Sequence, residues 1–289
     1  MYVHGDNLIQ KENHKTKYTD RISRQYLAEI RKKYDKWKKV NERLKGPHIK
    51  KLKKDSEIIQ KRVRLFNEYK DFVDQQHYAE KFDSRSNLHS SILEEFIFYL
   101  FNDLVSEFSD KALIGKARTF KDMFFQARSY KEMIDKPCAQ IEIKEHDFVI
   151  GVNINTDMKC EGSKNKQTEI LQVPAIAIEC KTYLDKTMLE GSSVAGYQLL
   201  SRNPNAMYVV VAEWLKLTDK VNLKKYRVDQ IFVLRKQKNT DREFRYDESY
   251  VKNPIYPDVV EALFEMVREH LTTTWDGAIQ DKLETGLLI

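Results

Sequence analysis

Apolar residues recur at helical intervals through the first quarter of the chain. One series predicts an amphipathic helix over residues 20–45, and its members are Tyr26, Ile30, Tyr34, Trp37 and Leu44. Gly46-Pro47 ends this helix. A second series, spaced by seven, predicts a helix over about residues 48–80, and its members are Leu52, Ile59, Phe66 and Val73. We therefore expect an antiparallel helical hairpin, preceded by about 18 polar residues without regular structure.

The pattern then changes from helical to alternating and back. The polar segment 83–90 carries helix-capping residue types, an apolar helix is expected over 91–108, and residues 110–137 are also expected to be helical. We expect strands at 141–143 and 148–154, a turn at 144–146 and a loop at 156–169. The apolar run 173–178 predicts a buried strand. A helix at 188–201, strands at 206–212 and 228–234, and a helix at 259–271 complete a pattern typical of an α/β fold.

The amino-acid composition argues against several classes of protein. Only 9 Gly and 6 Pro in 289 residues argue against a turn-rich sandwich or barrel. No apolar run approaches the roughly 18 residues of a membrane span, and the N-terminus lacks the apolar segment of a secretory signal. The three cysteines form no CxxC pair, which argues against a disulfide framework and a zinc site. We expect a cytoplasmic protein that does not enter a membrane.

Positive charge is concentrated in the expected helical hairpin. The chain has a net charge of +6, but residues 31–64 hold 15 Lys and Arg against 4 Asp and Glu, and the remaining residues sum to −5. This asymmetry indicates a polyanionic partner, with nucleic acid as the first candidate. The alternative is a helix pair whose charged outer faces are simply solvated. We divide the chain into a basic helical region, residues 1–85, for DNA-backbone binding or dimerisation, and a second domain, residues 86–289.

The apolar run 173–178 leads into Glu179-Cys180-Lys181. Residues two apart in a strand share a face, so a carboxylate and an ammonium lie side by side where charges seldom occur without a partner or ligand. Asp147 lies 32 residues before Glu179, where it opens the expected strand DFVIG. Carboxylates on neighbouring strands can bind Mg²⁺, and a lysine beside them can position or activate water. This chemistry suits the hydrolysis of phosphodiester bonds.

Two other triplets have a similar composition, at residues 142–144 and 157–159. Neither follows a buried apolar run, and neither has a matching aspartate on an earlier strand. Asp157 lies 22 residues before Glu179 and remains an alternative to Asp147.

The pattern formed by Asp147, Glu179 and Lys181 resembles the PD-(D/E)xK signature of nucleases, with His146 where that signature often has proline. The longer stretches IECKTYLDKTMLEG and SSILEEFIFYLF resemble the Bpu10I-like group of restriction endonucleases, over roughly residues 86–235. The resemblance implies a restriction-endonuclease-like α/β core, a mixed central sheet flanked by helices, behind an N-terminal helical arm. It further implies a Mg²⁺-dependent type II restriction endonuclease of double-stranded DNA, with a cognate DNA methyltransferase in the same bacterial system.

By this resemblance Asp147 and Glu179 bind the metal ion, and Lys181 positions or activates water. A glutamate from the preceding helix joins such sites in many enzymes of the fold, and the resemblance points to Glu94. The helical periodicity alone does not choose between Glu94 and Glu95, because both lie on the flanks of the apolar stripe.

Contacts with DNA phosphates are expected from basic residues of the hairpin and from one residue after the site strand. These are Lys50, Lys51, Lys53, Lys54, Arg62 and Lys186. The loop 159–167 carries side chains able to read base edges. Cleavage of both strands needs two active sites and the chain offers one, so we expect a homodimer or a heterodimer with a related subunit. The alternatives are a repair or recombination nuclease of the same fold, or a non-catalytic DNA-binding subunit.

Overall fold

A computed structural model describes residues 2–82, 87–239, 249–275 and 283 of the chain. The N-terminal part of these residues is helical: α1 (Val3–Glu12), α2 (Arg21–Arg43), α3 (Asp55–Val73), α4 (Gln76–Lys81) and α5 (Ser90–Phe108). The strands that follow are β1 (Leu113–Phe125), β2 (Ala139–Lys159), β3 (Lys166–Leu184), β4 (Met207–Leu215) and β5 (Gln230–Val233). The helices between and after them are α6 (Tyr130–Asp135), α7 (Lys186–Arg202) and α8 (Pro257–Thr272). A membrane-spanning helix is absent from the described ranges.

The strands form one mixed sheet in the order β1-β2-β3-β4-β5. β1, β2 and β3 are antiparallel, whereas β4 and β5 run parallel to β3. Parallel neighbours need a long crossover, which α7 supplies between β3 and β4. The expected mixed sheet flanked by helices is therefore confirmed.

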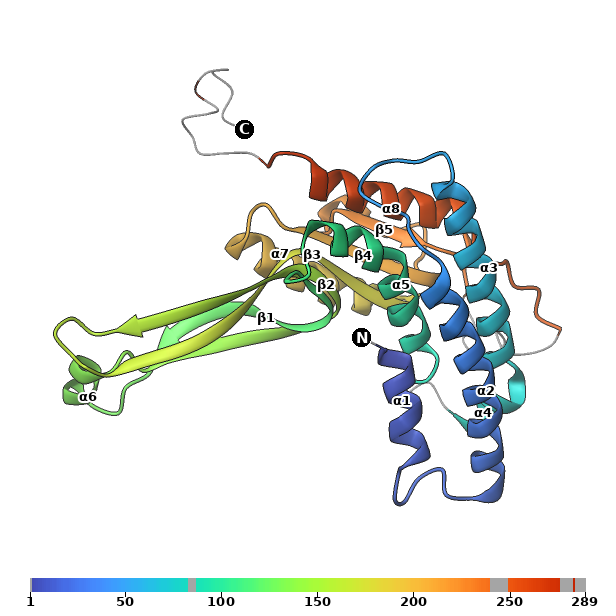
Figure 1. Ribbon diagram of the computed structural model, residues 1–289, viewed down its shortest axis with the longest axis horizontal. Helices are drawn as coiled ribbons and strands as arrows, with labels where there is room; N and C mark the ends of the chain where they lie inside the picture. The colour runs from blue at the N-terminus through green and yellow to red at the C-terminus, as the bar shows by residue number, and fades with distance from the viewer. Residues whose placement is uncertain (1, 83–86, 240–248, 276–282, 284–289) are drawn as a thin grey trace.

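Helices cover both faces of the central sheet (Figure 1). On one face, α5 and α8 lie in an apolar core that also includes side chains of α2 and α3. On the other face, α7 packs against β4 in a smaller core. α5 is apolar on most of its circumference because it lies between the sheet and the N-terminal helices: Phe96 stacks on Phe66 of α3, and Phe101 contacts Phe148 of β2. The N-terminal helices thus share one core with the sheet, and the boundary expected at residue 85 lies outside the described residues.

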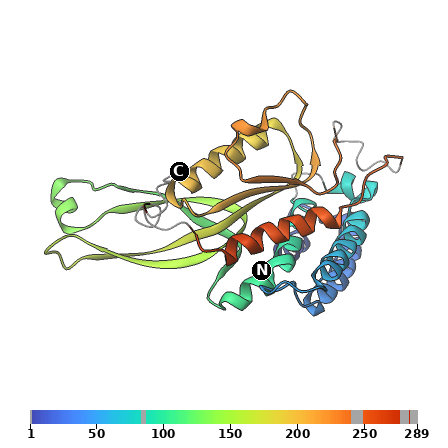
Figure 2. The ribbon, with the colours of Figure 1, turned by 90° about the horizontal axis from the view of Figure 1, so that it is seen from above.

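Parts of β1, β2 and β3 project from this body as a β-extension, which we define as residues 118–145 and 152–173 (Figures 1 and 2). β2 runs from the far end of the extension to the central sheet and back out. Ala139, at its start, accepts a hydrogen bond from Gln167 at 2.7 Å, and Lys159, at its end, pairs with Lys166. The strand changes direction near Gly151, where a Cβ would lie 2.2 Å from the carbonyl oxygen of Val173. Both register shifts near this point are β-bulges, which bend strands.

Several sequence-based expectations for the strands are wrong. Residues 110–137 contain the strand β1, and only the short helix α6 within that range matches the expected helix. Residues 144–146 lie inside the continuous strand β2 rather than in a turn. The loop expected at 156–169 shrinks to the connection between β2 and β3. Strands in the β-extension are stabilised by pairing with each other rather than by a buried face. Their alternation of polar and apolar residues is therefore weak.

The N-terminus also differs from expectation, because residues 3–12 form α1. Leu8 is fully buried, and the His4 ring lies 2.9 Å from the Ser91 hydroxyl and 2.7 Å from the Tyr69 hydroxyl. α3 begins at Asp55, later than the heptad pattern predicted, and a separate short helix, α4, follows it. Tertiary contacts with α5 hold α1 in place, and the periodicity of so short a helix does not reveal them.

Candidate active site

The buried strand β3 ends by presenting charged side chains. Ile176 and Ile178 are fully buried in the core beneath α5, and Glu179 and Lys181 follow them. The Lys181 ammonium donates a hydrogen bond to Glu179 Oε2 at 2.8 Å. The two side chains are therefore neighbours, as the alternation of a strand requires.

Asp147 joins this pair from β2. The ladder between β2 and β3 stops at the pair of Phe148 and Ile178, one residue short of Asp147. Asp147 Oδ2 accepts hydrogen bonds from the backbone N–H of Cys180 at 2.9 Å and from the Lys181 ammonium at 3.2 Å. Lys181 thus bridges carboxylates on two adjacent strands.

The alternative aspartate lies elsewhere. Asp157 is exposed in the β-extension, where it pairs with Lys166 at 2.7 Å and accepts a hydrogen bond from Thr168 at 2.8 Å. The structure therefore brings Asp147, and not Asp157, to Glu179.

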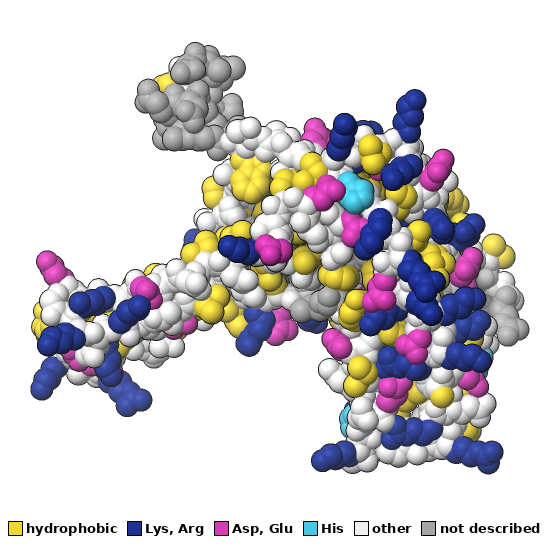
Figure 3. Space-filling model, in the orientation of Figure 1, with side chains coloured by type: hydrophobic (Ala, Val, Ile, Leu, Met, Phe, Trp, Pro, Cys, Tyr) yellow, Lys and Arg dark blue, Asp and Glu magenta, His cyan; other side chains and the backbone are white. Residues whose placement is uncertain are grey.

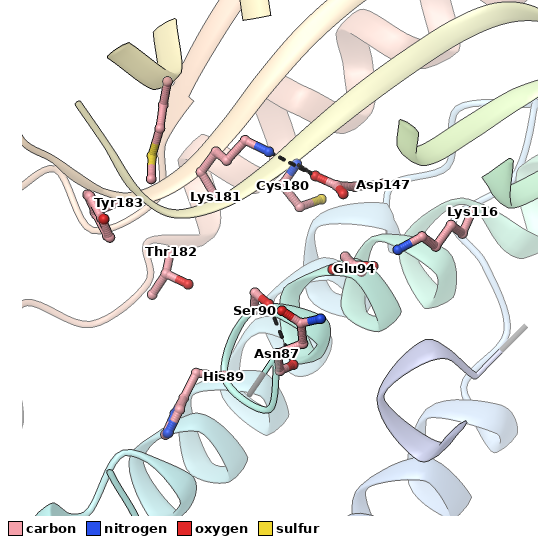
Figure 4. A pocket seen from close by; sticks show the side chains of 11 residues that line it. Asn87, His89, Ser90, Glu94, Lys116, Asp147, Cys180, Lys181, Thr182 and Tyr183 are labelled. Atoms are coloured by element: carbon pink, nitrogen blue, oxygen red, sulfur yellow. Dashed lines mark hydrogen bonds and ion pairs between the residues drawn. The ribbon is translucent and has the colours of Figure 1, made fainter. Parts of the chain in front are cut away.

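The two adjacent glutamates of α5 point to different neighbours. Glu94 lines the same cavity as Asp147 and Lys181 (Figure 4). Glu95 is fully buried on the other side of the helix, where it accepts hydrogen bonds from the first N–H groups of α1 and from two tyrosines. These donors are His4 N, Gly5 N, Tyr34 Oη and Tyr99 Oη, at 2.8–3.1 Å. Glu95 is thus committed to holding α1, and Glu94 is the glutamate of this pair that faces the cavity.

A cavity of about 340 Å³ opens over this cluster, between α5, β1, the middle of β2 and the C-terminal end of β3. Its lining is mostly polar and consists of Asn87, His89, Ser90, Glu94, Lys116, Asp147, Cys180, Lys181, Thr182, Tyr183 and Met188. Figure 4 shows Glu94 between Lys116 and the β3 residues.

His146 is a part of the site that sequence reasoning did not assign. It is 2% exposed, and its Nδ1 lies 3.2 Å from Glu179 Oε1. An ionised carboxylate only accepts hydrogen bonds, so Nδ1 carries the proton and donates. The ring packs edge-on against Tyr208 of β4. The only sequence signal was its position next to Asp147.

The electrostatics of the cluster favour a bound cation. Burial and the charge of Asp147 raise the pKa of Glu94 to about 7. Burial also raises the pKa of Asp147, against the opposing charge of Lys181. For Glu179, hydrogen bonds from His146 and Lys181 outweigh burial and hold its pKa well below the usual range. Burial alone would lower the pKa of Lys181, but the nearby carboxylates of Asp147 and Glu179 outweigh burial and raise that pKa.

The donor set fits a hard divalent ion. Magnesium prefers carboxylate oxygens and keeps several of its waters, so it does not need a full protein cage. Glu94 Oε2 is buried and has no hydrogen-bond partner among the described residues. The Lys181 ammonium lies between the carboxylates of Asp147 and Glu179. A bound metal ion would lie beside this ammonium and contact the same two carboxylates. No group of three His, Cys, Asp or Glu side chains within the described ranges already converges on a single point, so a metal would draw these carboxylates together.

The residues expected to contact DNA phosphates fall into three groups. Lys50, Lys51, Lys53 and Lys54 are exposed in the segment before α3, where basic side chains also gather over α2 and α3 (Figure 3). His89 of the cavity contacts Asp74 at the opposite end of α3, which is 19 residues long. The four lysines therefore lie about 27 Å along α3 from the cavity. Lys186 is exposed at the start of α7, two residues before Met188 of the cavity lining.

Arg62 is a correction, because it does not reach the surface. It is 1% exposed, and its guanidinium donates hydrogen bonds to the backbone oxygens of Asn41, Leu44 and Gly46 at 2.8–3.2 Å. It closes the end of α2 and the turn that follows, since those carbonyls have no partner within the helix. The base-reading loop expected at 159–167 lies at the far end of the β-extension, roughly 40 Å along the strand β2 from Asp147.

The fold and the cluster have the form of a PD-(D/E)xK nuclease: adjacent strands of a mixed sheet bring Asp147, Glu179 and Lys181 together beside one cavity. A family model described as Bpu10I restriction endonuclease matches residues 85–288, and the chain belongs to this family. It is thus a subunit of a type II restriction endonuclease, which cleaves DNA at a specific site.

A solved structure supports the fold independently. The structure, titled "native BbvCI A2B2 tetramer at low resolution", is similar to this chain with a TM-score of 0.69 and 17% sequence identity. The match covers 94% of this chain and 97% of that chain, so it includes the N-terminal helices. No curated protein matches the chain.

Proposed function

We propose that this chain supplies one Mg²⁺-dependent active site of a restriction endonuclease, with Asp147 and Glu179 as metal ligands and with Lys181 and Glu94 beside them. The observation that carries the proposal is the Lys181 ammonium, which donates to Asp147 at 3.2 Å and to Glu179 at 2.8 Å. Restriction endonucleases generally use divalent metal ions, and the buried carboxylates favour one here.

Each side chain has a role that follows from its position. Bound Mg²⁺ would lower the pKa of a coordinated water and neutralise charge on the scissile phosphate. Asp147 and Glu179 hold the ion from two strands, and His146 fixes the orientation of Glu179. The Lys181 ammonium donates to the attacking water or to a phosphate oxygen that gains charge. Glu94 faces the same space from α5 and accepts a hydrogen bond from water there.

Cleavage of plasmid DNA tests this site. The purified protein, with its partner subunit where one exists, is expected to give discrete fragments with Mg²⁺ and none with EDTA. Lys181→Ala and Glu179→Ala are each expected to lower the double-strand cleavage that yields fragments by at least about 100-fold, as the loss of a transition-state contact does. Lys144→Ala is the matched control, because Lys144 belongs to the triplet at residues 142–144, is exposed in the β-extension and does not line the cavity.

Two outcomes would count against the proposal. Unchanged cleavage by Lys181→Ala would remove the site assignment. DNA binding without cleavage under any Mg²⁺ condition would favour the non-catalytic DNA-binding subunit.

The proposal includes an assembly and a cellular setting. The described residues contain one such cluster, and cleavage of both strands needs two. The similar structure is titled as an A2B2 tetramer, which favours pairing with a related but different subunit over a homodimer. We place the enzyme in the bacterial cytoplasm beside a cognate DNA methyltransferase that protects host sites. A methyltransferase reading frame next to this gene would support that setting, and protection of plasmid DNA by its product tests it directly.

A further inference from the structure

Lys116 on β1 stands opposite an irregularity in β2. Gly115 pairs with Val149 and Ala117 pairs with His146, so two residues of β2, Asp147 and Phe148, face the single residue Lys116. This is a β-bulge, a feature that often re-aims side chains beside active sites. Gly115, the residue of β1 before Lys116, has a φ of +108°, which side-chain-bearing residues rarely adopt. The backbone of β1 therefore also departs from regular strand geometry at this point.

The bulge places Lys116 in the cavity of the proposed active site. Its side chain lines that cavity with Glu94 and Asp147, and Figure 4 shows it reaching toward Glu94. It comes from β1, whereas Lys181 comes from β3, so the two ammonium groups approach the carboxylates from different sides.

The two lysines differ in what already holds them. Lys181 donates hydrogen bonds to two carboxylates. Lys116 is exposed and has no hydrogen-bond or ion-pair partner among the described residues. The other basic residues of β1 are paired: Arg118 with Glu145 at 3.7 Å and Lys121 with Glu142 at 2.9 Å. Lys116 is therefore the cation of β1 that remains available to an anion entering the cavity.

We propose that Lys116 binds a backbone phosphate of the DNA strand that enters this cavity. The proposal rests on the proposed nuclease function and adds a substrate-binding residue to it. Glu94 and Asp147 line the cavity and Glu179 lies beside them, with the half-buried Lys181 as their counter-charge, so a polyanion meets repulsion there before any metal is bound. A lysine at the open side offsets that repulsion as a point charge, and the contact requires no particular base sequence.

The test compares DNA binding by Lys116→Gln, Lys116→Arg and the matched control Lys121→Gln. Binding of a fluorescein-labelled DNA duplex to the complete enzyme is measured in Ca²⁺ between about 50 and 200 mM salt. Lys116→Gln is expected to lower the slope of log affinity against log salt by about 1 and to weaken binding about tenfold. Lys116→Arg keeps the charge and is expected to keep the wild-type slope, as is Lys121→Gln.

Cleavage kinetics provide a second readout. Lys116→Gln is expected to raise KM for plasmid DNA with kcat retained, because a phosphate contact formed on binding persists in the transition state. A slope and a KM equal to wild type in Lys116→Gln would overturn the inference. Absence of cleavage by the wild-type enzyme would instead overturn the proposed function, and the binding slopes would still decide the role of Lys116.

Discussion

Two adjacent glutamates on α5 illustrate how one residue step changes a role. Glu94 faces the cavity with one carboxylate oxygen unpartnered among the described residues, whereas Glu95 accepts four hydrogen bonds beneath α1. Glu94→Gln is therefore expected to lower cleavage by about 100-fold or more and to leave the free energy of unfolding unchanged. Glu95→Gln places an amide N–H opposite the groups that donate hydrogen bonds to Glu95, so some of these bonds are lost. It is expected to lower the free energy of unfolding by about 2–3 kcal/mol.

Urea unfolding and plasmid cleavage on both variants check this pair. Each variant serves as the control of the other, because both replace a buried glutamate with its amide on the same helix. Equal stability losses in the two variants would contradict the assignment of Glu94 to the site. Sequence periodicity could not separate these residues, since their difference comes from α1, a helix that the pattern did not predict.

His146 provides a second prediction at this scale. Its Nδ1 donates to Glu179 Oε1, and removal of such a partner of a metal ligand usually costs 10–100-fold in metal affinity. His146→Ala is expected to raise the Mg²⁺ concentration for half-maximal cleavage by about that factor. His146→Asn keeps a donor at nearly the same place and is expected to restore most of the loss. Equal effects of the alanine and asparagine variants would show that the ring only fills space against Tyr208.

At the scale of elements, the sequence predicted the helices and strands that pack against a hydrophobic core. α2, α5, α7, α8 and the buried part of β3 carry clear periodicity because one face of each is covered. β1 and the outer halves of β2 and β3 are held by strand pairing in the β-extension, so hydrophobic pattern carries little information there. The positions of Asp147, Glu179 and Lys181 were predictable because Asp147 and Glu179 directly adjoin covered apolar runs, 148–150 in β2 and 176–178 in β3, and Lys181 follows two residues after Glu179. The bend in β2 was not, because it depends on bulges set by neighbouring strands.

A buried charge network fixes α3 against the sheet and the start of α5. Asp74 accepts a hydrogen bond from His89 at 3.0 Å and lies 3.4 Å from the Lys70 ammonium, which also pairs with Glu213 of β4. Burial alone would raise the pKa of Asp74, but Lys70, His89 and the more distant Lys252 hold that pKa well below its usual range. A carboxyl with a lowered pKa in the folded state stabilises the fold at neutral pH.

This network predicts a pH-dependent stability. Asp74→Asn is expected to lower the free energy of unfolding by about 3–5 kcal/mol at pH 7, because it leaves buried positive charge unpaired. The wild-type advantage is complete above the unfolded pKa of about 4 and is lost as pH falls below it. Urea unfolding between neutral and acid pH measures both proteins. A difference that stays constant down to the lowest accessible pH would contradict this origin of the stability.

At the scale of the whole molecule, the basic N-terminal helices cannot be treated as a removable module. Their side chains belong to the same core as α5 and the sheet, so deletion of residues 1–80 would unfold the chain. Replacement of Lys50, Lys51, Lys53 and Lys54 by serine tests the predicted phosphate contacts without touching that core. The slope of log affinity against log salt is expected to fall by about 1 for each lysine in contact with DNA. An unchanged slope would assign the segment to packing or dimerisation instead.

The number of active sites in the assembly decides how the enzyme cuts. Each chain contributes one cluster of Asp147, Glu179 and Lys181, and each strand of a duplex needs its own cluster. If the enzyme pairs this chain with a related subunit, an assembly that carries Lys181→Ala keeps one working site and is expected to convert supercoiled plasmid into nicked circles. If it is a homodimer, the same variant loses both sites, and the plasmid stays supercoiled. Gel separation of supercoiled, nicked and linear plasmid therefore distinguishes the two assemblies, and linear product at the wild-type rate would contradict both.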